Sequence, residues 1–444
     1  MMRRRGCVQA LALGALATAG LGAAGAAAAD EAAPAPAARG DAAALDLFVV
    51  LRRAGSEGQR VDWLDGTSLA PRGRFTSPGP LNPHVAFSAD AQGRAHAWLS
   101  TAAGDAVRLR LDAEERALAR PLGGALAGLA VAADGSCVMA VHDDPPLLVF
   151  WDGALAQPLR RIAVATREGR AAAGVAAWGA SAARRSFFVA PAGLPELWEI
   201  SHDPRAEDFY EGLVHDFRFG EGVPTRGFLG ARRTRLPRPL ASSGSSASYR
   251  SLALDPGAVH VLGEAAGDAI DVVNPDVRRR VAVIDGAAVR LRGAAFAAAV
   301  AGNGAPPAPP AGPAAPLIAP LAGQAALAFI DSERWTIAAR APLPGEAVAV
   351  VAHRRTAQAM VQVRTAAGDA LCVLDVQRQA VAAVRRYDGV RLGALAFSRD
   401  GQRLLVARSA ADAGLQALDA RTLAVLADLP GGEAVALHHG DGAF

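Results

Sequence analysis

One short pattern recurs along the whole chain: an apolar run that ends in Asp or Asn, a polar turn, and a second alternating run. Its clearest copy spans 370–386, where Leu371 and Val373 precede Asp375 and Val381 follows it, so that each run has one apolar face. Asp is favoured at the head of such a turn because its carboxylate accepts a backbone N–H two residues on. A single hairpin cannot bury its own apolar face, so the pattern requires neighbours of the same kind.

The chain contains eight copies of this hairpin pattern. In each copy the first run ends at an Asp or Asn, namely Asp65, Asp112, Asp152, Asp203, Asn274, Asp331, Asp375 and Asp419. These positions are 47, 40, 51, 71, 57, 44 and 44 residues apart. An interval in the low-to-middle forties is typical of one four-stranded propeller blade.

A second phrase precedes several of the copies and supplies the other two strands of a blade. Its clearest example spans 396–406, a strand, an Asp-Gly turn and a returning strand, and 86–90, 130–135 and 252–257 are similar to it. Two hairpins per repeat predict an all-β fold, an eight-bladed β-propeller over residues 45–437. A seven-bladed ring, with one copy miscounted, is the alternative.

The two ends of the chain predict export and a short tail. Three arginines at 3–5, an apolar run from Val8 and small residues before Asp30 indicate a secretory signal peptide over 1–29. We therefore expect a periplasmic protein with no membrane segment after signal cleavage. Residues 30–44 are expected to be a flexible Ala/Pro leader, and 438–444 a C-terminal tail.

Charge and cysteine content exclude some functions. The chain has 46 basic and 43 acidic residues, a net charge of +3, which gives no reason to expect nucleic acid as a partner. All the basic residues are arginine, and a G- and C-rich gene explains this without selection of any single arginine. Cys137 and Cys372 lie in apolar patterns, either as buried free thiols or as a disulfide. No Cys-x-x-Cys-His motif is present, so no haem c is expected.

Two of the intervals are long because they contain additional segments. Residues 205–250 form a polar, arginine-rich insertion, and residues 301–316 form a Pro/Ala loop. The first insertion is too polar for a blade and too rich in Phe, His and Arg for a linker. Long insertions in a rigid all-β scaffold are often binding loops, so we expect the ligand site here.

Within this insertion, segments 211–221 and 227–234 resemble the cytochrome d1 haem-domain family. That family includes the d1 domain of cytochrome cd1 nitrite reductase and the NirF-type and NirN-type proteins of haem d1 biosynthesis. The resemblance implies an eight-bladed periplasmic propeller that binds haem d1 or a late precursor non-covalently, in its biosynthesis or delivery for denitrification. It also implies other haem d1 assembly proteins as partners and, if the protein is an enzyme, a tetrapyrrole-modifying oxidoreductase.

The departures from that family leave a second interpretation open. Residues 282–300 are Ala-rich and contain no His, although related proteins would place one near the tetrapyrrole there. The alternative is a degenerate, non-catalytic propeller that acts as a protein-interaction scaffold. A hydrolase propeller with a central metal would need converging Asp, Glu and His residues, which the sequence does not reveal.

Five residues are the candidates for the tetrapyrrole site. His215 is the candidate iron ligand and catalytic proton-transfer group, because neutral imidazole suits iron and the unperturbed pKa of an imidazole, about 6.5, suits proton transfer. His353 is a second candidate ligand. Arg218, Arg232 and Arg233 are candidates for binding tetrapyrrole carboxylates, since guanidinium meets carboxylate bidentately. The alternatives are loop histidines and arginines that only face solvent.

Overall fold

The structure is a computed structural model. It describes residues 46–55, 58–77, 79–112, 117–211, 223–237, 248–265, 269–284, 288–297, 315–353, 356–409 and 414–439. Regular structure in these ranges is β-strand throughout, and no helix there has the length and hydropathy needed to cross a membrane.

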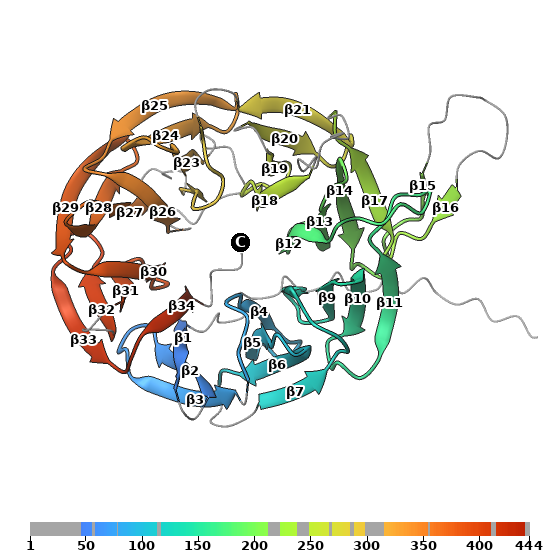
Figure 1. The fold of residues 1–444 in the computed structure, drawn as a ribbon, viewed down its shortest axis with the longest axis horizontal. Helices are drawn as coiled ribbons and strands as arrows, with labels where there is room; N and C mark the ends of the chain where they lie inside the picture. Colours follow the sequence, from blue (N-terminus) through green and yellow to red (C-terminus); the bar gives the residue numbers. More distant parts are fainter. Residues whose placement is uncertain are drawn as a thin grey trace, which may run out of the picture. The chain divides into compact units, whose positions relative to one another are not determined.

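Eight four-stranded antiparallel sheets surround a central axis, as Figure 1 shows. Each sheet is one blade, and we label its strands A to D from the axis outward. The predicted eight-bladed β-propeller is therefore confirmed, and the seven-bladed alternative is wrong.

Among the first four blades, blade 1 includes a strand from the C-terminal end of the chain, and blade 4 is interrupted by an insertion. Blade 1 comprises β34 (Ala434–His439), β1 (Leu47–Gly55), β2 (Gly58–Asp65) and β3 (Pro71–Ser77). Blade 2 comprises β4 (Ala86–Ala89), β5 (Ala95–Ser100), β6 (Asp105–Arg110) and β7 (Ala117–Pro121). Blade 3 comprises β8 (Gly128–Val131), β9 (Cys137–Asp143), β10 (Pro146–Asp152) and β11 (Pro158–Ala163). Blade 4 comprises β12 (Val175–Ser181), β13 (Ser186–Pro191), β14 (Glu196–Ser201) and β17 (Ala231–Arg235).

The other four blades follow the chain in simple order. Blade 5 comprises β18 (Tyr249–Leu254), β19 (Val261–Ala265), β20 (Ile270–Asn274) and β21 (Arg279–Ile284). Blade 6 comprises β22 (Ala295–Phe296), β23 (Leu317–Pro320), β24 (Ala326–Asp331) and β25 (Thr336–Pro342). Blade 7 comprises β26 (Glu346–Ala352), β27 (Gln358–Arg364), β28 (Gly368–Asp375) and β29 (Ala380–Asp388). Blade 8 comprises β30 (Arg391–Phe397), β31 (Arg403–Ser409), β32 (Gly414–Asp419) and β33 (Val425–Pro430).

The ring is closed by a strand from the C-terminal end of the chain. β34 is the A strand of blade 1 and pairs antiparallel with β1, with His439 opposite Phe48. The imidazole Nε2 of His439 also lies 2.7 Å from a carboxylate oxygen of Asp46. The prediction of a tail from residue 438 is thus wrong for His438 and His439, because backbone pairing continues through both.

The repeated Asp and Asn residues all lie at the turn between strands C and D. The Asp419 carboxylate, for example, accepts the backbone N–H groups of Arg421 at 3.0 Å and Thr422 at 2.8 Å. The same turn ends at Leu423, whose φ of 59° is left-handed. The Asp-Gly phrase instead forms the turn between strands A and B, as between β30 and β31. Both predicted hairpins of the repeat are confirmed.

This topology gives the propeller two different faces. The A–B and C–D turns lie on one face, which we call the turn face. The B–C turns and the D–A connections between blades lie on the other, which we call the connection face. Because neighbouring strands are antiparallel, the end of a strand fixes the face on which a residue lies.

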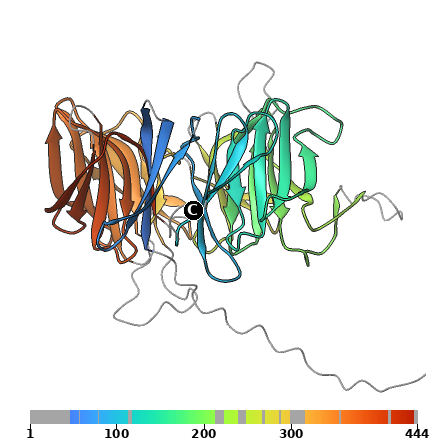
Figure 2. The same ribbon diagram turned by 90° about the horizontal axis from the view of Figure 1, so that it is seen from below.

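The polar insertion at 205–250 forms a separate hairpin and also supplies the outermost strand of blade 4. β15 (Phe209–Glu211) and β16 (Val223–Thr225) pair as a separate two-stranded sheet inside the C–D connection of blade 4. Figures 1 and 2 show this hairpin projecting outward from the ring. β17 then completes blade 4 as its outermost strand. The prediction that the insertion contains no blade strand is wrong for β17, because its backbone pairs with β14 despite its arginine-rich sequence.

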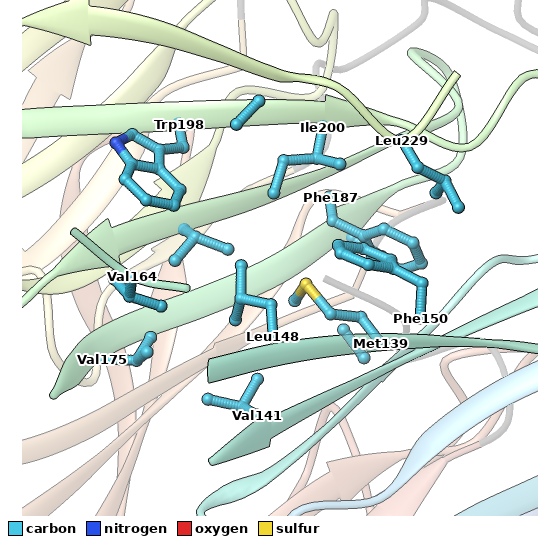
Figure 3. Close-up of a cluster of buried hydrophobic side chains, with 14 of the residues drawn as sticks. Met139, Val141, Leu148, Phe150, Val164, Val175, Phe187, Trp198, Ile200 and Leu229 are labelled. Atoms are coloured by element: carbon cyan, nitrogen blue, oxygen red, sulfur yellow. The ribbon is translucent and has the colours of Figure 1, made fainter. Parts of the chain in front are cut away.

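Apolar side chains fill the space between neighbouring blades. Figure 3 shows the cluster between blades 3 and 4, where Phe150 and Phe187 pack with their ring centroids 5.9 Å apart. Burying each such side chain stabilises the fold by roughly 1.5–3 kcal/mol. Cys137 belongs to this cluster and Cys372 to the one between blades 6 and 7, and both are free thiols. Burial raises the pKa of Cys137 to about 12 and that of Cys372 to about 11.

Candidate functional site

A cavity of about 360 Å³ lies among the connection-face ends of blades 5, 6 and 7. Blade 5 contributes Arg250 at the start of its A strand and Glu264 at the end of its B strand. The connection from blade 5 to blade 6 contributes Arg290 and Arg292, and the first residue of β26 contributes Glu346. The cavity is therefore bordered by strands close to the axis, and its charged lining is mainly arginine.

Glu264 is the buried residue of the cavity wall, and its hydrogen bonds hold the neighbouring backbone in place. One carboxylate oxygen, Oε2, accepts hydrogen bonds from the backbone N–H of Leu291 at 2.9 Å, that of Arg292 at 3.2 Å and the Ser251 hydroxyl at 3.0 Å. These bonds tie the blade 5–6 connection to the B strand of blade 5. Glu264 is 5% exposed, so losing these partners would leave a buried charge unsatisfied.

The other carboxylate oxygen of Glu264 faces two guanidinium groups. Its Oε1 lies 3.8 Å from Nη2 of Arg250 and 3.6 Å from Nη1 of Arg290. The Arg250 side chain is 52% exposed and that of Arg290 33% exposed, so both guanidiniums reach solvent beyond the buried carboxylate. Arginine presents several N–H donors in a plane, an arrangement that matches a carboxylate. The cavity is thus suited to a ligand with carboxylate groups.

One further histidine lies on the inner strand of blade 1, and another lies in the connection that leads to blade 2. His438, on β34, donates its Nε2 proton to the backbone carbonyl of Pro83 at 3.0 Å. His84, two residues before β4, packs edge-on against Trp178 of β12, with ring centroids 6.1 Å apart. Trp178 in turn donates its indole N–H to the Leu129 carbonyl at 3.4 Å. A chain of contacts therefore links the inner strands of blades 1, 3 and 4 through the connection that precedes β4.

The surroundings of both histidines favour the neutral form. Burial lowers the pKa of His84, and burial together with the nearby His84 lowers the pKa of His438. With Nε2 donating, Nδ1 of His438 carries the imidazole lone pair. Neutral imidazole is the form that binds a transition metal. Within the ranges that the structure describes, no group of three or more His, Cys, Asp or Glu residues is placed to hold a metal ion by itself.

The arginines predicted from the insertion lie in a different layer of the fold. Arg232 and Arg233 are on β17, the outermost strand of blade 4. The Arg233 guanidinium stacks over Trp198, 4.4 Å from the ring centroid, and its Nη1 donates to the Ala165 carbonyl at 3.0 Å. The Arg232 guanidinium lies 5.8 Å from the ring centroid of Phe209. These arginines do not border the cavity, because β17 is separated from the axis by three strands.

His353 has a structural environment on the turn face. It is 7% exposed, so the alternative of a loop histidine that only faces solvent is wrong. Its Nε2 donates to the Arg399 carbonyl of blade 8 at 2.9 Å, and its Nδ1 lies 2.8 Å from the Thr356 hydroxyl. Nε2 therefore joins blade 7 to blade 8, while Nδ1 has its partner within the A–B turn of blade 7. His215 and Arg218 lie outside the described residues, and their predicted roles stay predictions.

A solved structure with the same fold is similar to most of this chain. Dihydro-heme d1 dehydrogenase NirN in complex with DHE superposes with a TM-score of 0.70 and 21% sequence identity, over 90% of this chain and 77% of that chain. The chain has the fold of NirN. The predicted resemblance to the d1 haem-domain family is thereby confirmed at the level of fold.

The remaining comparisons add less. The C-terminal WD40 domain of Sif2 superposes with a TM-score of 0.49 and 12% identity, over 79% of this chain and 87% of that chain. No family model matches the sequence. No curated protein matches it either.

The sequence interpretation missed the residues that line the cavity. Arg290 and Arg292 lie within 282–300, a segment characterised only by its alanines and its lack of histidine. Two arginines spaced i, i+2 just before the A strand of blade 6 were the sequence pattern that could have indicated a ligand site. Arg250 is the last residue of the insertion 205–250, where the ligand site was expected, but it was not among the candidate residues. Glu264 had no signal, since it resembles an ordinary polar residue of a strand. His438 was assigned to the tail instead of to the closing strand.

Proposed function

We propose that this protein is a periplasmic d1-type propeller that binds haem d1 or a late precursor, and that it acts in haem d1 biosynthesis or delivery for denitrification. The arginine-lined cavity on the connection face carries this proposal. It supplies guanidinium groups beside the axis of a fold like that of NirN, whose solved complex contains DHE. The periplasmic part rests on the signal peptide predicted over 1–29.

The side chains of this protein suit both the carboxylates and the iron of such a ligand. Arg250, Arg290 and Arg292 suit its carboxylates, because guanidinium and carboxylate pair through two parallel hydrogen bonds. The neutral imidazoles of His84 and His438 suit its iron. When bound, the cofactor would supply an iron centre for one-electron chemistry. Other haem d1 assembly proteins are the proposed partners.

A titration with haem d1, followed in the visible spectrum, tests this proposal. We expect the purified protein to shift the Soret band of haem d1 saturably. Replacing His438 with Ala is expected to alter the position of the shifted band, because an imidazole near the iron is lost. His215→Ala is the matched comparison, since it removes the histidine first predicted from the sequence.

The outcomes show which of the two histidines is the iron ligand, and whether the protein binds the cofactor or is a non-catalytic scaffold. A changed spectrum only in His438→Ala assigns the ligand role to the inner strand, and a changed spectrum only in His215→Ala assigns it to the insertion. Absence of any Soret shift with the unaltered protein contradicts cofactor binding. In that case the non-catalytic scaffold becomes the better interpretation.

A further inference from the structure

We infer that the cavity among blades 5, 6 and 7 recognises the free carboxylates on one edge of the macrocycle, and that Glu264 is the positioning residue that aims its arginines. This inference rests on the proposed function and specifies which chemical groups of the ligand are recognised. The chain's own residues carry it: a buried acid with five polar contacts, and three arginines that share one cavity.

The volume of the cavity limits what it can enclose. At about 360 Å³ it is close to the lower end of the range of small-molecule sites, about 300–1,000 Å³. A cavity of this size accommodates the acidic side chains of a tetrapyrrole and leaves the ring itself outside. The cavity borders the innermost strands β18 and β26, so the ring would extend toward the axis.

The charge of the cavity favours an anion. Arg250, Arg290 and Arg292 contribute three positive charges, and Glu264 and Glu346 contribute two negative ones, which leaves a net charge of +1. The buried Glu264 faces the guanidiniums from the protein side, while Arg250 and Arg290 remain partly exposed on the other side. A carboxylate that enters from the cavity therefore meets donors already held in place, which reduces the entropy cost of binding.

Glu264 contributes geometry as well as charge. It holds the backbone of Leu291 and Arg292 and contacts two guanidiniums, so the relative positions of all three arginines depend on it. Glu264→Gln retains a carbonyl oxygen that can accept the two backbone N–H groups but loses the ion pairs. The substitution raises the net charge of the cavity by one unit while releasing Arg250 and Arg290.

The first experiment compares haem d1 with the same macrocycle after methylation of its carboxylates. We expect the unaltered protein to prefer the free acid by about tenfold or more in Kd, equivalent to about 1.4 kcal/mol. Arg292→Gln should reduce this preference several-fold, because a donor to the carboxylates is lost. The matched control is Arg340→Gln on the outer strand β25, an exposed arginine outside the cavity, which should leave the preference unchanged.

The second experiment separates positioning from simple charge. If Glu264 positions the arginines, Glu264→Gln binds the free acid more weakly in spite of its higher positive charge, and its affinity depends more steeply on salt concentration. If Glu264 only neutralises charge, the variant binds the free acid more tightly, and the positioning role is overturned. Circular dichroism and thermal unfolding of the variant establish that the propeller is intact.

The outcomes also separate this inference from the proposed function. Equal binding of the acid and the ester by the unaltered protein preserves tetrapyrrole binding and overturns carboxylate recognition. Loss of the preference in Arg340→Gln to the same extent as in Arg292→Gln also overturns it. Binding of neither compound contradicts the proposed function itself.

Discussion

Blade 4 and the cavity of blades 5 to 7 are both rich in arginine, but their arginines have different partners. In blade 4, Arg184 and Arg233 direct their guanidiniums into the fold, onto carboxylates, carbonyls and an indole ring. In the cavity, Arg250 and Arg290 share one buried carboxylate and still reach solvent. The first group is placed to stabilise the propeller, and the second is the group that we propose binds a ligand.

The difference shows that the position of an arginine within a blade matters more than the local density of arginines. The insertion 205–250 attracts attention in the sequence because it departs from the repeat. Its described arginines on β17 nevertheless lie three strands away from the axis. The cavity arginines lie close to the axis: Arg250, the last residue of that insertion, is on the A strand of blade 5, and Arg290 and Arg292 are in the connection to blade 6. The predictions below test this division between stabilising and ligand-binding arginines.

The largest effect on stability is expected from Arg184→Met. Arg184 bridges blades 4 and 5, with Nε 2.8 Å from Glu199 and Nη2 2.6 Å from Asp276. Burial alone would lower the pKa of Arg184, but its hydrogen bonds to the two carboxylates raise the pKa above its usual value. The substitution leaves the nearly buried Glu199 unpaired, so we expect a loss of about 3–5 kcal/mol in the free energy of unfolding, measured in urea.

The contribution of Asp276 to that loss is small, because its side chain is 58% exposed and solvent screens the ion pair. Provided that the variant is studied below its unfolding transition, its preference for the free acid of haem d1 should equal that of the unaltered protein. An unfolding free energy within about 0.5 kcal/mol of the original would show that this bridge does not stabilise the fold.

A smaller effect is expected from Arg233→Met. The substitution removes the hydrogen bond to Ala165 and the stacking over Trp198, which together contribute roughly 1–3 kcal/mol to stability. We expect a lower midpoint in urea and an unchanged Kd for haem d1. Weaker binding of haem d1 with unchanged stability would break the comparison and return the ligand site to the insertion.

The smallest effect is expected from mild acid, through His202 of blade 4. Burial lowers the pKa of His202, and Arg185 lowers it further, while the nearby Asp134 and Asp203 raise it. A histidine whose pKa is depressed in the folded state binds a proton more readily when unfolded, so stability falls as pH decreases below about 6.5. Thermal unfolding between pH 7.5 and pH 5.5 should show this fall, and His202→Gln should reduce its slope. An identical slope in the variant would contradict the assignment.

Much of the fold could be predicted from the sequence because the repeat is specified by local interactions. An Asp such as Asp65 accepts the backbone N–H of Thr67 and Ser68, all within one turn, and Leu69 then takes a left-handed φ of 59°. Such turns are visible as a residue pattern, so eight C–D turns could be counted. The closing strand was missed because β34 pairs with β1, a partner about 390 residues away that no local pattern indicates.

The site was predicted less well, for the same physical reason. Arg232 and Arg233 were chosen for their residue type, and only the pairing of β17 with β14 places them at the outer edge. His353 is a candidate by its chemistry, and only the packing of blade 8 against blade 7 gives its Nε2 a partner, the Arg399 carbonyl. The contact between Glu264 and the Arg292 backbone joins residues 28 positions apart.

The amino-acid sequence by itself determined the number of blades and the position of each C–D turn, since each turn is stabilised within a few consecutive residues. Only the tertiary structure decided which arginines meet in one cavity. Arg250, Glu264 and Arg292 come from two strands and one connection of adjoining blades, and they converge because blade 6 packs beside blade 5. A charged cavity of this kind is a property of that packing, because residues far apart along the chain form it.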